Sequence, residues 1–119
     1  MRNKAQYHRW EPSLADLADL TPLRARALIA TCFFEAQRET IARAKSTLGL
    51  PTTDAEIRAS AEGSLRMAFS KVSADYDAPT RETLHRAVES LVETSRAFGT
   101  PADIIEHHRR IIEGVLARL

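Results

Sequence analysis

The sequence predicts an all-α protein: a four-helix bundle, mostly antiparallel, with a short N-terminal arm or extra helix. Apolar residues recur at intervals of three and four along four separate segments, which is the spacing of one face of a helix. Residues that cap, begin or stop helices stand between these segments. Because the connections are short, successive helices must turn back on one another, and we expect residues 14–119 to form a single domain.

The composition is that of a globular protein with balanced charge. With 119 residues, the chain can bury roughly two-thirds of its extended surface, and its hydrophobic fraction of 44% is sufficient for a core. The net charge of +1 creates no overall attraction for phosphate backbones, so a nucleic-acid partner is not expected. One cysteine allows no internal disulfide, and there is no apolar N-terminal run. These features predict a cytoplasmic protein without a membrane contact.

Residues 1–13 are expected to form a flexible polar arm. They lack helical periodicity and carry three cations: Arg2, Lys4 and Arg9. Trp10 either packs on the bundle or frays with the arm. As a further alternative, this basic arm binds nucleic acid. Ser13 and Asp16 have the spacing of a capping box, which allows a short helix over 13–20.

The first long helix is expected over residues 22–48, about 26 residues or roughly 40 Å at the α-helical rise. Its apolar seam is widened by a second apolar row in the N-terminal half, so two sides of the helix need cover. Neighbouring helices or a second subunit must supply that cover. We therefore predict a homodimer, with a candidate dimer surface formed by Ile29, Phe33 and Phe34.

The second helix is expected over residues 54–73. Thr53 and Glu56 form a capping box at its start. Gly63 lies in the middle of the helix, where glycine costs about 1 kcal/mol relative to alanine. It either permits a close approach of another backbone or is simply tolerated.

The last two helices are expected over 80–98 and 101–119, as a tight antiparallel hairpin. Thr80 or Asp77 caps the first of these two helices. Gly99 tolerates the left-handed turn that ends a helix, and Pro101 suits a first helical position.

His108 is the most prominent candidate for a functional side chain. It lies at the centre of the last helix's apolar face, and a buried imidazole needs a hydrogen-bond partner. Gln37, in the seam of the first long helix, is the polar group placed to supply it. Cys32 lies between apolar neighbours and is expected to be inert. His108, Gln37 and Cys32 thus form a candidate buried polar site, with either a structural role or a ligand-binding one.

No motif indicates an enzyme, a metal site or a cofactor. Glu82 and His85 have the Glu-x-x-His spacing of carboxylate-bridged bundle sites, but only one copy is present. Asp103 and His107 could pair, yet two ligands do not make a zinc site. We find no catalytic triad, glycine-rich phosphate loop or Cys-x-x-Cys motif.

The charged side of the last helix is a candidate partner-facing surface, with a solvated face as the alternative. Its members are Glu106, His107, Arg109, Arg110 and Glu113.

The segment 84–119 resembles the helical N-terminal domain of the RsbU-type stress-response phosphatases. The matching pattern is a helix, a turn of helix that begins with proline, and then His-Arg with aliphatic spacing: Pro101, Ile104, Ile105, His108, Arg109, Ile112 and Leu116. The resemblance implies a dimeric helical bundle that binds a switch-kinase-like activator and passes the signal to an attached phosphatase domain. The chain departs from that family in its long first helix pair, and neither a further helix nor a phosphatase domain follows the hairpin.

These observations favour a non-catalytic module that binds another protein in bacterial signalling or regulation. The alternative is a helical bundle that binds a small molecule or a metal at a core site near Gln37 and His108.

Overall fold

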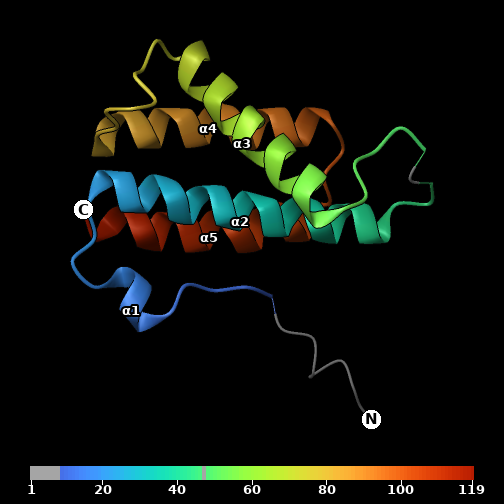
Figure 1. Cartoon of the computed structure of the whole chain (residues 1–119), viewed down its shortest axis with the longest axis horizontal. Helices are drawn as coiled ribbons and strands as arrows, with labels where there is room; N and C mark the ends of the chain where they lie inside the picture. Colours follow the sequence, from blue (N-terminus) through green and yellow to red (C-terminus); the bar gives the residue numbers. More distant parts are fainter. Residues whose placement is uncertain (1–8, 47) are drawn as a thin grey trace.

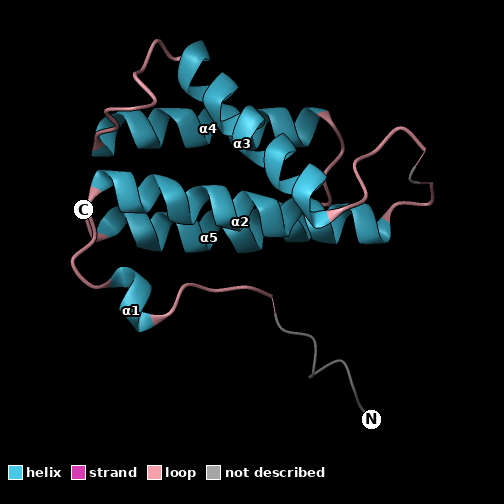
Figure 2. Ribbon diagram, viewed as in Figure 1, coloured by secondary structure: helices cyan, strands magenta, loops and turns pink. Residues whose placement is uncertain are grey.

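The computed structural model describes residues 9–46 and 48–119. Within these ranges the chain forms five helices: α1 (Leu14–Leu17), α2 (Pro22–Arg43), α3 (Asp54–Lys71), α4 (Arg81–Ala97) and α5 (Ala102–Ala117) (Figure 1). No strand occurs in the same two ranges (Figure 2). The predicted all-α class is confirmed.

The four long helices alternate in direction around a shared core. Helices α2 and α4 run one way, and α3 and α5 run back (Figure 1). Helix α2 packs against α3 and α5, while α4 contacts the same two helices from the other side. Helix α3 crosses its neighbours obliquely, whereas α2, α4 and α5 lie nearly along one axis (Figure 1). The predicted antiparallel bundle is therefore confirmed, with α1 as the extra short helix.

The core is assembled from all four long helices. Apolar side chains with the predicted three-and-four spacing point inward, and removing them from water drives the helices together. The largest fully buried side chains come from α2, α3, α4 and α5: Phe69, Ile29, Leu65, Leu84, Ile104, Leu116 and Cys32.

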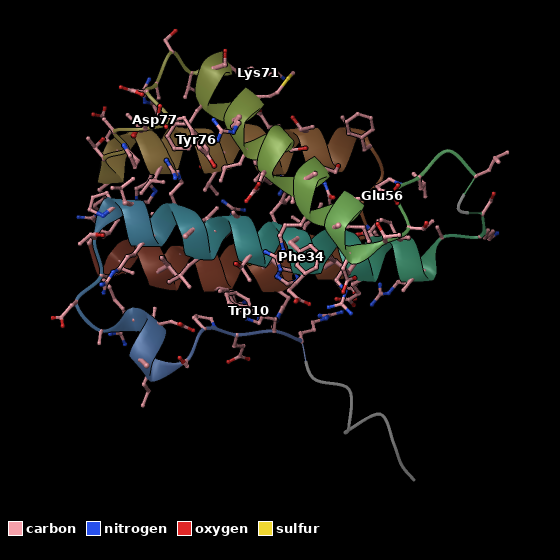
Figure 3. All side chains as sticks on the ribbon, viewed as in Figure 1. Trp10, Phe34, Glu56, Lys71, Tyr76 and Asp77 are labelled. Atoms are coloured by element: carbon pink, nitrogen blue, oxygen red, sulfur yellow. The ribbon has the colours of Figure 1, made fainter. Side chains whose placement is uncertain are left out.

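The candidate dimer surface on α2 is wrong, because the bundle itself covers it. Ile29 is 0% exposed and lies in the main core cluster. Phe34 is 3% exposed and packs against Ile57 and Ala61 of α3, as Figure 3 shows for its position beside that helix. Phe33 is half-buried and packs on both clusters. The width of the apolar face reflects two helix neighbours within one chain.

Local capping confirms several predicted helix starts. The Thr53 hydroxyl accepts from the Glu56 N–H, and the Glu56 carboxylate accepts from the Thr53 N–H. The hydrogen bonds that the Glu56 carboxylate accepts from the backbone N–H groups of Thr53 and Thr52 hold the pKa of Glu56 below its usual value. Thr80 caps α4, and Ser13 caps α1 with its predicted capping box.

Several predicted helix boundaries are wrong by one to five residues. Helix α2 stops at Arg43, five residues before its expected end. Every residue from Ala42 to Ser46 is exposed, so no apolar neighbour stabilises a further turn. Helix α5 starts at Ala102, and Pro101 is its N-cap, with extended backbone at ψ 140°. Gly99 takes the expected left-handed conformation, at φ +84°.

Gly63 is exposed, and a Cβ atom built there would meet no heavy atom of the described chain within 4 Å. The interpretation of Gly63 as a close-packing residue is therefore wrong, and the glycine is simply tolerated in α3.

Aromatic and cationic groups anchor the connector between α3 and α4. The guanidinium carbons of Arg26 and Arg66 lie 4.0 and 4.2 Å from the centroid of the Tyr76 ring. The ring meets Phe69 edge-on, with centroids 5.3 Å apart. Arg26 also donates a hydrogen bond to the Tyr76 carbonyl oxygen. Tyr76 thus fixes the connector to the bundle near the start of α4 (Figure 3).

Candidate functional site

A cavity of about 420 Å³ lies between α2, α3, α4 and α5. It occupies the end of the bundle where α2 ends and α5 begins, on the right in Figure 1. Its walls are mainly apolar, and the apolar residues that line it include Phe33, Ile41, Val88, Leu91, Ile104 and Ile112. We refer to this space as the bundle cavity.

The sequence explains why the bundle cavity lies at this end. Here α3 and α4 contribute the small side chains of Ser60, Ser64 and Ser95 to the wall. Toward the opposite end, the same two helices place Phe69 and Leu84 in the core, both with no exposed surface. Serine occupies much less volume than these residues, so the helices leave space between them.

Gln37 and His108, two of the three predicted members of the buried polar site, both line the bundle cavity. They form no hydrogen bond with one another, so the predicted pairing of Gln37 with His108 is wrong. The partner of the imidazole is Cys32, whose Sγ lies 3.1 Å from Nδ1 of His108.

Burial keeps both members of the Cys32–His108 pair uncharged at neutral pH. Desolvation, with a smaller effect from Glu35, raises the pKa of the Cys32 thiol to about 12. Desolvation, helped by the neighbouring His107, lowers the pKa of His108 to about 4, against an opposing effect of Glu39. Sγ of Cys32 also lies 3.7 Å from the carbonyl oxygen of His108, so the contact fits either a thiol that donates to Nδ1 or an Nδ1–H that donates to Sγ.

Each of the two cavity residues carries a buried polar atom without a hydrogen-bond partner among the residues described. These atoms are Oε1 of Gln37 and Nε2 of His108. His108 is only 5% exposed, so bulk water does not solvate its ring freely. A buried polar atom without a partner costs about 1–3 kcal/mol. Both atoms have almost no accessible surface, so neither is open to the cavity in this structure.

A network of four charged side chains lies on the other side of His108, and the sequence did not reveal it. Arg9 donates to Oε2 of Glu39 from Nε at 3.1 Å and from Nη2 at 2.8 Å. Its Nη2 also lies 2.7 Å from Oδ2 of Asp103, and Arg43 contacts both acids at 2.9 and 2.8 Å. The guanidinium of Arg43, followed by that of Arg9, holds the pKa of Asp103 well below its usual range.

This network fixes part of the predicted arm to the bundle. Trp10 packs against the core cluster, and Figure 3 shows it on the side of the N-terminal segment that faces the bundle. A recess of about 300 Å³ beside it is lined by residues that include Trp10, Glu39 and His108. Arg2 and Lys4 of the predicted arm lie outside the described residues, and the flexibility of that part stays a prediction.

The charged residues of α5 pair mainly with one another. Arg109 lies 3.4 Å from Glu113, and Arg110 lies 3.7 Å from Glu106, both at i,i+4 spacing. His107 is half-buried, with its Nε2 buried and lacking a partner in the described chain. Arg109 also lines the bundle cavity. The candidate partner-facing surface therefore contains two surface ion pairs. Its remaining member, His107, is partly buried.

The described residues contain no group of three or more histidine, cysteine or acidic side chains that could hold a metal ion. Cys32 and His108 are a pair only, and the exposed Glu82 and His85 gain no further ligand there.

None of the helices in residues 9–46 and 48–119 is long and apolar enough to cross a membrane.

Comparisons with protein-family models, curated proteins and solved structures give no match for this chain.

Proposed function

We propose that this chain binds a small, largely apolar molecule in the bundle cavity. One observation carries the proposal: a cavity of about 420 Å³ has mainly apolar walls and is also lined by two polar side chains, Gln37 and His108. Ligand sites typically measure about 300–1,000 Å³ and combine apolar walls with a few polar groups that orient the ligand. The bundle cavity has this size and this composition.

The cavity edge supports entry of an apolar molecule. Phe98, which is 85% exposed, and Leu50, which is also exposed, both line the cavity. Exposed apolar side chains beside a cavity can contact a hydrophobic molecule before it is buried. Leu50 belongs to the connector after α2, and Phe98 is the C-cap of α4, so two separate segments form this edge.

A cavity-filling substitution tests the proposal. Butylbenzene should raise the melting temperature of the wild-type protein, because a molecule that binds only the folded state stabilises it. Ser95→Phe places an aromatic ring in the cavity wall and should abolish this shift. Ser70→Phe makes the same chemical change at an exposed position of α3 outside the cavity and should retain it. Equal shifts in Ser95→Phe and wild type, or none in wild type, would contradict the proposal.

A second function, binding of another copy of this chain, is favoured by a different observation. Leu48 is 93% exposed and Phe98 is 85% exposed. The exposed Leu50 and Phe98 line the same cavity edge, so they form a patch, and exposed apolar patches are typical of surfaces that contact another protein. The resemblance of the C-terminal hairpin to the RsbU-type N-terminal domain supports the same role, in signalling or regulation.

Light scattering tests this second proposal. A homodimer has twice the 13.3 kDa mass of one chain, and Phe98→Ser should shift the protein toward the monomer. A wild-type mass of one chain at micromolar concentration would contradict it.

A further inference from the structure

The bundle cavity approaches the protein surface along the seam between α4 and α5. On the α5 side, the buried Ile104 and Ile112 line its inner wall. Ile105 and Arg109 also line the cavity, but they are half-buried and four positions apart, so they form a second row nearer the surface. Val92 of α4 is half-buried in the same way. We refer to Val92, Ile105 and Arg109 as the α4–α5 rim.

A depression in the protein surface lies directly outside this rim. It measures about 140 Å³, and its walls are formed by residues of α4 and α5. Val88, Val92, Arg109 and Ile112 line both the depression and the bundle cavity. Because the two spaces share these walls, one end of a ligand can reach water at the rim while the rest of it stays buried.

The inner part of the cavity suits an aliphatic chain. Oε1 of Gln37 and Nε2 of His108 have almost no accessible surface. The hydroxyls of Thr40 and Thr94 donate to backbone carbonyl oxygens one turn earlier in their own helices, at 2.8 and 3.0 Å. None of these four atoms is free to bind a ligand, so a polar group carried inside would lose its water partners without replacement.

Arg109 gives the rim a positive charge. It is the one permanently charged residue among those that line the cavity, and its side chain is 41% exposed. A long cationic side chain of this kind packs its carbon stem on an apolar wall and keeps its charge in water. Its partner Glu113 lies 3.4 Å away on the exposed surface, where such a pair is weak and an incoming anion can replace it. The acids of the depression, Glu89, Glu93 and Glu113, do not line the cavity.

We infer that the ligand of the bundle cavity is an amphiphile, with an aliphatic chain inside the cavity and one anionic head group paired with Arg109 at the α4–α5 rim. This inference rests on the proposed function, and it specifies the chemical class of the ligand. Apolar contacts with the walls supply most of the binding energy, and the guanidinium selects the charge of the head group.

Three probes with the same aliphatic chain test the inference by isothermal titration at pH 7: decanoate, decanol and decylammonium. We expect decanoate to bind about ten-fold more tightly than decylammonium, because an exposed charge contributes a few-fold in affinity by attraction and a similar factor by repulsion. Equal affinity of these two probes, or tighter binding of decylammonium, would overturn the inference. Binding of decanol in that case would leave the proposed function intact.

Two variants locate the preference at Arg109. Arg109→Gln removes the charge and keeps most of the stem, so it should weaken decanoate about three- to five-fold and leave decanol unchanged. Arg110→Gln is the matched control, because Arg110 is the next residue of α5, is 71% exposed, pairs with Glu106 and does not line the cavity. It should leave the affinity for decanoate unchanged. No loss in Arg109→Gln, or equal losses in the two variants, would overturn the assigned role of Arg109.

Ser95→Phe separates failure of this inference from failure of the proposed function. Because it fills the cavity, it should abolish binding of all three probes, decanol included. If none of the probes binds the wild-type protein, or if decanol binds Ser95→Phe as tightly as wild type, the proposed function is wrong and the ligand class falls with it.

Discussion

The Sγ atom of Cys32 lies 3.1 Å from Nδ1 of His108, which joins α2 to α5 through two buried polar side chains. The residues are 76 positions apart in the sequence. Their contact fixes the orientation of the imidazole of His108, a residue that lines the bundle cavity. Both side chains are neutral at pH 7, and each produces a measurable consequence.

The Cys32 thiol should resist modification while the protein is folded. Burial and its pKa of about 12 leave almost no accessible thiolate at pH 8. With a disulfide reagent such as Ellman's reagent, we expect labelling at least about a thousand-fold slower than in denaturing guanidinium chloride, because labelling must await unfolding. Comparable rates in the two conditions would show that Cys32 is accessible in the native state.

Stability should fall between pH 7 and pH 5 because of His108. Its folded pKa of about 4 lies below its ordinary value of 6.5, so in this range the unfolded state binds more protons than the folded state. Lowering the pH to 5 should therefore decrease the free energy of unfolding by about 2 kcal/mol. Urea denaturation at the two pH values measures the change.

His108→Phe isolates this contribution, since it removes the titrating group and leaves the other histidines in place. The variant should lose most of the stability difference between pH 7 and pH 5. The chosen range also lies above 3.8, the ordinary pKa of Asp103, so that carboxylate stays charged in both states. A wild-type slope that persists unchanged in the variant would show that other groups cause it.

Arg9 should hold the N-terminal segment against the bundle. It donates to the buried Glu39 and to Asp103, and hydrogen bonds to charged groups contribute about 1.5–3 kcal/mol each where burial is complete. Because Arg9 is partly exposed, we expect Arg9→Ala to lower the free energy of unfolding by about 1–2 kcal/mol. The fluorescence of Trp10, the one tryptophan of the chain, should shift to longer wavelength.

Arg81→Ala, at an exposed position at the start of α4, is the matched control and should leave both readouts unchanged. Identical Trp10 emission in Arg9→Ala and wild type would mean that other contacts position the segment.

Gly63→Ala should stabilise the protein. Gly63 lies inside α3 on an exposed face, and a Cβ there meets no described heavy atom within 4 Å. Alanine has the higher helix propensity, so we expect the free energy of unfolding to rise by about 0.5–1 kcal/mol. Chemical denaturation measures it. A decrease in the free energy of unfolding would show that α3 packs against another molecule at Gly63.

The parts of the fold that depend on local sequence were predictable. The capping box of Thr53 and Glu56 involves residues three apart, and its hydrogen bonds follow from that spacing. The burial of His108 follows in the same way from the periodicity of its own helix. In both cases one segment contains all the information that the prediction needs.

Features that join distant segments were not predictable. Periodicity places Cys32, Gln37 and His108 on apolar faces. It does not fix the register of α2 along α5, and that register makes Cys32 the partner of His108. For the same reason the sequence does not show whether another helix or another subunit covers Phe34. The Arg9–Glu39 contact spans 30 positions and has no sequence signature.

The most direct test of ligand binding in the bundle cavity is a titration of the isotope-labelled protein with p-butylphenol, followed by nuclear magnetic resonance. We expect the amide signals of Gln37, Ser95 and His108 to shift with saturation, while that of Tyr76, in the connector between α3 and α4, stays in place. Shifts confined to residues away from these cavity walls, or none at all, would contradict the account.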